Sequence, residues 1–167
     1  MAKVNKENSD KITMTHILLD DIDLSILRIL QKNARATIRE IAEEVHLSAT
    51  PVHERIKRLE REEVIQQYTI LINPSKVQRN LKVICYVSLK EHNKTIGAKF
   101  IKLINEWQEV LECYNISGNF DFMLKVAVEN MDEYYHFHVY KLSQSELISN
   151  VQSMFVMGTL KEVNVTV

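Results

Sequence analysis

Hydrophobic residues recur every three to four positions through residues 21–61, and this spacing predicts three short amphipathic helices. Asp20 or Asp21 can cap the first helix, which should end near Asn33. Thr37 and Glu40 have the spacing of a capping box, so a second helix should begin there. The positions expected to face a common core are Ile22, Ile26, Leu27, Ile29, Leu30, Ile38, Ile41, Ala42, Val45, Val52, Ile56 and Leu59.

The third predicted helix follows a tight turn at residues 46–48, with Ser48 or Thr50 as its cap and Pro51 in its first turn. One side is apolar and the opposite side gathers positive charge. A helix of this kind after such a turn is how helix-turn-helix proteins enter the major groove of DNA. The candidates for base edges, near its amino-terminal end, are Thr50, His53, Glu54 and Lys57, and those for phosphate are Arg55, Arg58 and Arg61.

A solvated face with charges for solubility is the alternative interpretation of that helix taken alone. The capped helix before it, the short turn and the run after it together favour DNA binding. Residues 64–72 are rich in β-formers and predict a strand or hairpin packed on the helices, as in a winged helix-turn-helix. Asn73-Pro74 ends this run. We therefore expect a flexible lead over 1–17, a DNA-binding domain over 18–73 and a hinge over 74–81.

The remaining residues, 82–167, predict the order strand, helix, strand, strand, helix, strand. This βαββαβ order is typical of a ferredoxin-like α+β domain, in which one face of the sheet has no helix on it. Residues 83–89 are apolar on both faces, so the open face is expected to meet another subunit. The expected elements cover residues 83–90, 94–107, 110–117, 122–128, 131–145 and 151–165.

Few residues in this second domain indicate a binding or catalytic site. Gly118 to Asp121 can form a turn with a positive φ, and Asp121 could neutralise a ligand ammonium. A plain hairpin with a local Asp hydrogen bond is the interpretation that the residues alone favour. His136 and His138 diverge by about 200° on a helix and cannot share an ion, so no metal site is expected. No phosphate loop or catalytic triad is present, so neither an enzyme nor a cofactor is expected.

Composition narrows the class of protein. The 167 residues carry a net charge of −1, so any affinity for DNA must come from local charge. Cys85 and Cys113 lie far apart in apolar runs, which favours buried thiols in a reducing cytosol. The polar first fifteen residues do not form a signal peptide. No apolar run reaches the ~18–20 residues of a membrane span, and a cytoplasmic protein is expected.

Several segments closely resemble the Lrp/AsnC (leucine-responsive regulatory protein) family of transcription regulators. The resemblance runs through both predicted domains, from about Leu18 to the end of the chain. The segments that carry it are LDDID at 19–23, LQKNAR at 30–35, LSATPVHERIKRLER at 47–61, IQQYT at 65–69, NP at 73–74 and SGNFDF at 117–122.

This resemblance implies a winged helix-turn-helix joined by a hinge to a ferredoxin-like effector domain. It implies dimers formed through the sheets, further assembly to octamers or similar rings, and a small effector, usually an amino acid, bound between dimers. Asn115, Met154 and Phe155 depart from the leucine-responsive pattern, so leucine is not assigned as the effector. Carried over by position, the effector residues are Asn115, Gly118, Asp121, Met131, Ser153, Met154 and Phe155.

Two rival functions stay open on the sequence. Haem-biosynthesis decarboxylases resemble this family in both domains, but they have little use for the basic third helix. A protein that binds an effector and assembles without binding DNA is the second rival. A co-purifying tetrapyrrole would indicate the first rival, and the absence of a mobility shift with DNA would indicate the second.

Overall fold

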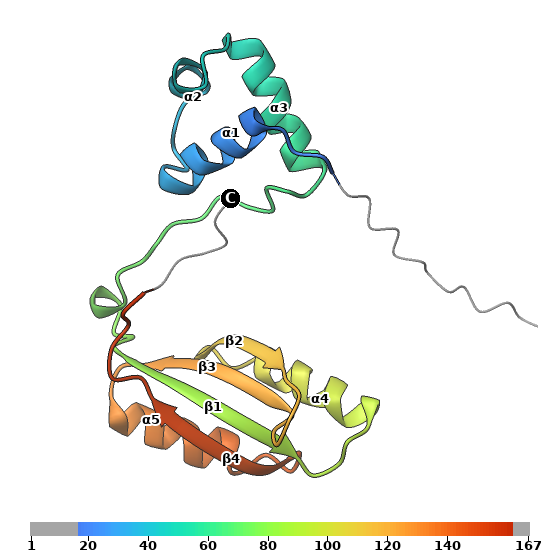
Figure 1. Cartoon of the computed structure of the whole chain (residues 1–167). Coiled ribbons are helices and arrows are strands. Elements are labelled where there is room, and N and C mark those ends of the chain that lie inside the picture. Colours follow the sequence, from blue (N-terminus) through green and yellow to red (C-terminus); the bar gives the residue numbers. More distant parts are fainter. Residues whose placement is uncertain (1–16, 162–167) are drawn as a thin grey trace, which may run out of the picture. The chain divides into compact units, whose positions relative to one another are not determined.

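The computed structural model describes residues 17–161, which fall into two compact units whose boundary along the chain lies between Ile70 and Leu71 (Figure 1). The described part of the N-terminal unit contains α1 (Asp21–Lys32), α2 (Ile38–Glu44) and α3 (Ala49–Arg61). The C-terminal unit is a sheet with helices on one face. Between residues 17 and 161, no helix has the length and apolar character needed to span a membrane. The predicted lead over 1–17 lies almost wholly outside the described residues.

Local hydrogen bonds begin the first two helices where the sequence predicts. The Asp23 backbone N–H donates to the Asp20 carboxylate at 2.8 Å, and the Asp20 N–H donates to the Asp23 carboxylate at 3.1 Å. Thr37 and Glu40 exchange the same two bonds, at 3.3 and 2.7 Å. Each pair satisfies backbone donors that the first turn of a helix leaves free. The predicted capping box of Thr37 and Glu40 is confirmed, and the first helix has a second box, Asp20 with Asp23, where the sequence predicts only a cap at Asp20 or Asp21.

The three helices share one apolar core, and the predicted inner positions are confirmed. Packing of α3 depends on Val52, Ile56 and Leu59, of which Val52 and Leu59 are fully buried. Burying each of these side chains stabilises the unit by about 1.5–3 kcal/mol, so their stripe fixes the rotation of α3 about its own axis. The opposite side of α3 must then face solvent. The buried core residues of this unit are Ile26, Leu27, Ile41, Ala42, Val52, Ile56 and Leu59.

The strand predicted over residues 64–72 is wrong for the described chain. Val64 and Ile65 are partly buried against the three helices, but residues 66–73 have no regular secondary structure. Ile70 and Leu71 are 76 % and 93 % exposed. A strand requires a neighbouring backbone to pair its N–H and C=O groups, and the described part of this chain supplies none here. High β-propensity alone therefore leaves this segment extended.

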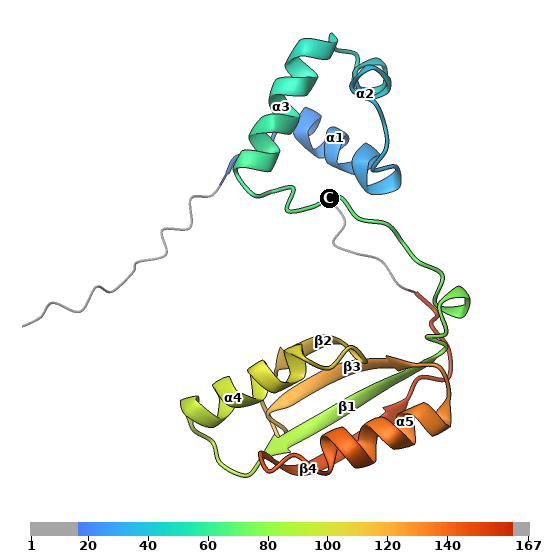
Figure 2. The ribbon, with the colours of Figure 1, turned by 180° about the vertical axis from the view of Figure 1, so that it is seen from behind.

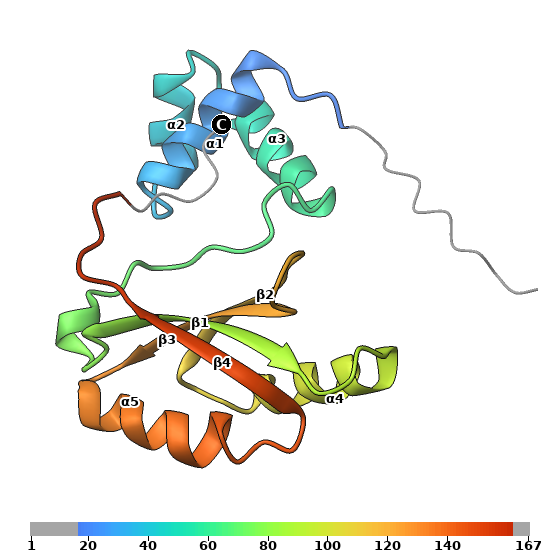
Figure 3. The same cartoon turned by 60° about the horizontal axis from the view of Figure 1, so that its bottom comes forward.

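The C-terminal unit has the predicted ferredoxin-like order, with α4 and α5 on the same face of the sheet (Figures 2 and 3). The strands lie in the order β2-β3-β1-β4, and each neighbouring pair is antiparallel. Val83, Cys85, Val87 and Leu89 of β1 point into the core under the helices. The elements are η1 (Pro74–Lys76), β1 (Leu81–Leu89), α4 (Lys94–Asn105), β2 (Val110–Asn115), β3 (Phe122–Val128), α5 (Met131–Phe137), η2 (His138–Leu142) and β4 (Ile148–Phe155).

The last helix and strand differ from their predicted bounds. After α5 the chain continues as the π-helical turn η2, in which Ser143 N–H donates to the carbonyl of His138 at 2.8 Å. The helical segment ends at Leu142, before the predicted residue 145, and β4 begins at Ile148 instead of residue 151. β4 ends at Phe155, and the predicted continuation to 165 extends beyond the described residues. The register of β4 with β1 pairs Ser153, Met154 and Phe155 with residues of the first half of β1.

Candidate DNA-binding and effector sites

Five of the seven predicted DNA-binding side chains are exposed along one side of α3. At about 100° per residue they fall within roughly 100° of the helix circumference, opposite the buried stripe of Val52, Ile56 and Leu59. Both ends of this surface are cationic or polar, and Glu54 is its one carboxylate. We call this surface the outer ridge; its residues are Thr50, His53, Glu54, Lys57 and Arg61.

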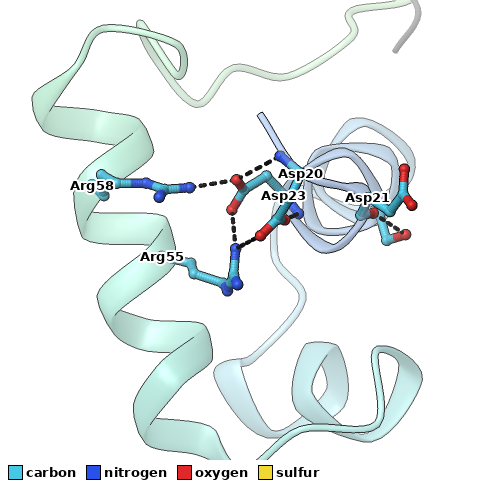
Figure 4. Close-up of polar contacts among 6 residues, drawn as sticks. Asp20, Asp21, Asp23, Arg55 and Arg58 are labelled. Atoms are coloured by element: carbon cyan, nitrogen blue, oxygen red, sulfur yellow. Dashed lines mark hydrogen bonds and ion pairs between the residues drawn. The ribbon is translucent and has the colours of Figure 1, made fainter. Parts of the chain in front are cut away.

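Arg55 and Arg58 lie on the flank of α3 that faces α1, where they bind aspartates (Figure 4). Asp23 is fully buried, and its two carboxylate oxygens accept from Arg55 at 2.7 Å and from Arg58. Arg55 also donates to Asp20 at 2.7 Å. The hydrogen bond from the Asp23 N–H and the one from Arg55 lower the pKa of Asp20. The bonds to Asp23 and then Asp20 raise the pKa of Arg55. We call these four residues the Asp23 cluster.

The Asp23 cluster changes what these arginines can do. Arg58 was expected to point outward with the outer ridge, but its guanidinium turns toward α1 and only 37 % of the side chain is exposed. Two guanidinium groups on one buried carboxylate tie α3 to α1, since such charges are costly to leave unpaired. Sequence reasoning missed this pairing. The available signal was spacing: an acidic pair three residues apart in α1 matches an arginine pair three residues apart in α3.

The cations of the outer ridge have acidic neighbours at the surface. Lys57 contacts Glu60 at 3.0 Å and Arg61 contacts Glu62 at 3.2 Å. The Tyr68 hydroxyl also donates to Glu60, and the bonds from Lys57 and Tyr68 lower the pKa of that carboxyl. The side chains of Lys57 and Arg61 are 60 % and 69 % exposed. Exposed pairs contribute about 0–1 kcal/mol, so a phosphate can replace either carboxylate.

Three of the predicted effector residues lie around the turn between β2 and β3. Gly118 has a φ of +121°, a conformation that strains any other residue, and the predicted positive φ is confirmed. The Asn115 side chain donates to the carbonyl of Asp121 at 3.0 Å. One oxygen of the Asp121 carboxylate accepts from the Leu89 N–H at 2.7 Å, and the other lies 3.0 Å from His92. We call Asn115, Gly118 and Asp121 the turn group.

The other four predicted effector residues lie on β4 and at the start of α5. Met131 is the first residue of α5 and is 55 % exposed. Met154 lies on the open face of the sheet, beside Ile84 of β1, and is 48 % exposed. Ser153 and Phe155 point to the other face, toward α5. We call Met131, Ser153, Met154 and Phe155 the strand group.

The turn group and the strand group do not converge within one copy of the chain. Asn115 is on β2, whereas Ser153, Met154 and Phe155 are on β4, and these two strands lie at opposite edges of the sheet. Three strand spacings separate these edges, or about 14 Å. The groups also lie toward opposite ends of β1, because Asp121 N–H bonds to the Val87 carbonyl whereas Phe155 pairs with Val83. One small ligand can touch both groups only if a second copy supplies one of them.

Other candidate chemistry is sparse in the described chain. Residues 17–161 contain no group of three or more His, Cys, Asp or Glu side chains that could hold a metal ion. His136 stacks on Tyr140 with ring centroids 5.5 Å apart. Cys85 is buried, Cys113 is half-buried, and both are free thiols whose pKa burial raises. A hollow of about 360 Å³ lies on the N-terminal unit between α1 and the end of α2, away from the outer ridge.

Sequence comparison assigns each half of the chain to a known domain. Residues 19–66 match the profile described as winged helix-turn-helix DNA-binding, and residues 82–166 match the Lrp/AsnC ligand binding domain. The glutamate uptake regulatory protein of Zymomonas mobilis is 34% identical over 143 residues, covering 86% of this chain and 87% of that protein. The leucine-responsive regulatory protein of Escherichia coli K12 is 34% identical over 146 residues, covering 87% and 89%.

Solved structures agree over nearly the same residues. A transcriptional regulator from Neisseria meningitidis, in complex with L-Met, has a TM-score of 0.83 and 32% identity, covering 87% of this chain and 94% of that one. An AsnC family regulator from Agrobacterium tumefaciens has a TM-score of 0.82 and 32% identity, covering 86% and 94%. The exposed ridge of α3, the ferredoxin-like unit and these matches lead to one conclusion. The chain belongs to the Lrp/AsnC family of transcription regulators.

Proposed function

We propose that this regulator reads duplex DNA with the outer ridge of α3 and responds to an amino acid bound between copies of its C-terminal unit. The observation that carries the proposal is the outer ridge itself. Its five polar side chains share one exposed side of α3, because the buried stripe holds the opposite side against α1 and α2. A helix presented in this way fits the major groove, where donors and acceptors on base edges can be read.

Within the outer ridge we assign Thr50, His53, Glu54 and Lys57 to base edges and Arg61 to phosphate. Lys57→Ala should then change the preference among sequences, with a loss of about 1–3 kcal/mol on the best operator. Arg61→Ala should weaken all sequences alike and reduce the slope of affinity against salt by about one. Mobility shifts over a salt series with genomic and random fragments test this division. Identical behaviour of the two variants contradicts it.

Arg55 and Arg58 take a different role in this proposal. Both arginines are bound to Asp23, so we propose that they orient α3 and do not contact the DNA phosphates. Arg55→Met should reduce stability and lower DNA affinity in proportion to unfolding. Arg61→Ala should instead lower affinity with no change in stability. Loss of affinity in a fully folded Arg55→Met protein would return this arginine to the DNA contacts.

We propose further that two copies pair through the open face of the sheet and that dimers assemble further, to octamers or similar rings. In the described C-terminal unit no helix covers this face (Figure 3). It carries Ile84, Tyr86, Met123, Tyr114 and Met154, as the strand registers show. Met123→Glu should shift the mass measured by light scattering toward one copy. Ile101→Glu, at an exposed position on α4, is the matched control and should leave the mass unchanged.

An amino acid with an apolar side chain is the effector that the residues favour. Met131, Met154 and Phe155 offer exposed apolar surface, and Asp121 offers a carboxylate whose His92 partner lies at the surface. The Neisseria meningitidis neighbour was solved in complex with L-Met, which supports this class. Binding between copies links effector and assembly reciprocally. Light scattering and thermal shifts with a panel of amino acids test the proposal, which fails if none changes either quantity.

The purified protein used for these assays also distinguishes the proposed function from its two rivals. The regulators found by sequence and structure comparison support a protein without catalytic activity. A decarboxylase would carry or bind a tetrapyrrole, which absorbance near 400 nm would reveal. An assembly protein without DNA binding would show no mobility shift at any salt concentration. A salt-sensitive shift with no tetrapyrrole absorbance supports the DNA-binding regulator over both rivals.

A further inference from the structure

Tyr134 lies beneath the strand group and is not one of the predicted effector residues. It is on α5, one turn after Met131, and is only 5 % exposed. Its hydroxyl donates to the Ser153 hydroxyl and lies 3.3 Å from the thiol of Cys85. Its ring meets the ring of Phe155 edge-on, with centroids 5.2 Å apart. One buried side chain therefore contacts two members of the strand group and lies on the helix that carries a third.

The position of β4 in the sheet makes these contacts matter. β4 is an edge strand, so its backbone pairs only with β1. An edge strand has half the ladder hydrogen bonds of a central strand and depends more on what packs against its faces. On the face toward α5, Ser153 and Phe155 meet the hydroxyl and the ring of Tyr134. The hydroxyl also reaches Cys85, which is the β1 partner of Ser153. Tyr134 thus fixes α5, β1 and β4 at one point.

We propose that Tyr134 is a positioning residue of the effector site. Its hydroxyl sets the rotamer of Ser153 and its ring sets that of Phe155, so the β4 half of the site is formed before the effector arrives. Preorganisation of this kind raises affinity because fewer side chains lose freedom on binding. The inference rests on the proposed function, since it concerns the same site. It adds that effector affinity depends on a buried group with no contact to the effector.

The test compares Tyr134→Phe with Cys85→Ala, using L-methionine as the probe and the full chain. Tyr134→Phe keeps the ring but removes the bond to Ser153. Losing one such hydrogen bond corresponds to an affinity about fivefold to tenfold weaker by calorimetry. Cys85→Ala removes the other partner of the same hydroxyl and the contact of that thiol with Ser153, but it leaves the bond from Tyr134 to Ser153. It should bind L-methionine as the unsubstituted protein does.

A double-mutant cycle between Tyr134→Phe and Ser153→Ala separates positioning from general loosening. If Tyr134 acts through Ser153, the double variant should bind no more weakly than Ser153→Ala alone, because the second change has nothing left to remove. Tyr135→Phe, on the exposed side of the same helix, is a further control and should match the unsubstituted protein. Additive losses, or equal losses in Cys85→Ala and Tyr134→Phe, overturn the proposal.

Hydrogen exchange keeps the inference testable without a ligand. In Tyr134→Phe the amides of β4 should exchange faster, while those of the β2–β3 turn should not change. If the unsubstituted protein does not bind L-methionine, this amino acid is not its effector, and exchange alone decides the role of Tyr134. Unchanged exchange in β4 then overturns the positioning role. The failure of one proposal is therefore distinguishable from the failure of the other.

Discussion

Replacing the buried Asp23 with asparagine should destabilise the N-terminal unit more than the loss of any one exposed charge in that unit. The change keeps the size of the side chain and one oxygen for the Asp20 N–H, but it removes the charge that Arg55 and Arg58 share. Both guanidinium groups then face a neutral amide. The substitution therefore isolates the ionic part of the Asp23 cluster from its part in helix capping.

The magnitude follows from the burial of each partner. Removing one member of a buried ion pair costs about 3–5 kcal/mol. Here Asp23 is fully buried, but the arginine side chains are 25% and 37% exposed, and Arg55 keeps Asp20. Water and Asp20 offset part of the loss, so we expect about 2–3 kcal/mol. A unit of this size is stable by only about 3–8 kcal/mol, at roughly 0.05–0.15 kcal/mol per residue.

Urea denaturation followed by circular dichroism at 222 nm measures the effect. With a slope of about 1–1.5 kcal/mol per molar for a small unit, the helical transition should move down by about 2 M. Asp21→Asn is the matched control: it removes the same charge from a residue two positions earlier, which is exposed. Equal midpoints for Asp23→Asn and Asp21→Asn would refute the reasoning, because the cluster would then contribute no more than a surface charge.

Three further predictions concern acid, conformation and thiols. The pKa values of Glu40 and Asp20 are lowered from 4.5 and 3.8, the first chiefly by the Thr37 N–H and the second chiefly by the Asp23 N–H. Their contribution to stability is therefore present above about pH 4.5 and is lost as pH falls through the folded values. Glu40→Gln should flatten this acid limb in pH-dependent denaturation, and an unchanged limb would count against the capping box. Gly118→Ala should destabilise the protein by about 2 kcal/mol because of the positive φ. Gly97→Ala, in open space within α4, should instead stabilise it by about 0.5–1 kcal/mol. Thermal denaturation checks both, since the two midpoints should shift in opposite directions. Burial raises the pKa of both thiols, so a disulfide reagent should label Cys113 slowly in the native protein and Cys85 only on unfolding. Native labelling that survives Cys113→Ala would contradict this order.

The sequence determined those features that depend on neighbours three or four residues away. Local spacing predicted the capping box of Thr37, the cap of the first helix, the apolar stripes of the first three helices and the bounds of β3, because a helix turn or a strand pleat fixes which side chains lie on one face. The positive φ at Gly118 followed in the same way from the chemistry of a tight turn. The likeness to a family of regulators was also visible, since its segments are contiguous in the chain.

Tertiary structure alone decided which distant groups meet. Arg55 and Arg58 pair with Asp23 across 32 and 35 residues, and these pairings withdraw two cations from the set that the sequence assigned to DNA. The segment over 66–73 has the residues of a strand but no backbone beside it in the described chain, so it stays extended without pairing. The seven effector positions divide into two separate groups, with Asn115 and Met154 on opposite edge strands, because strand order depends on long-range pairing. Spacing along the chain specifies a face, whereas packing between elements specifies what that face touches.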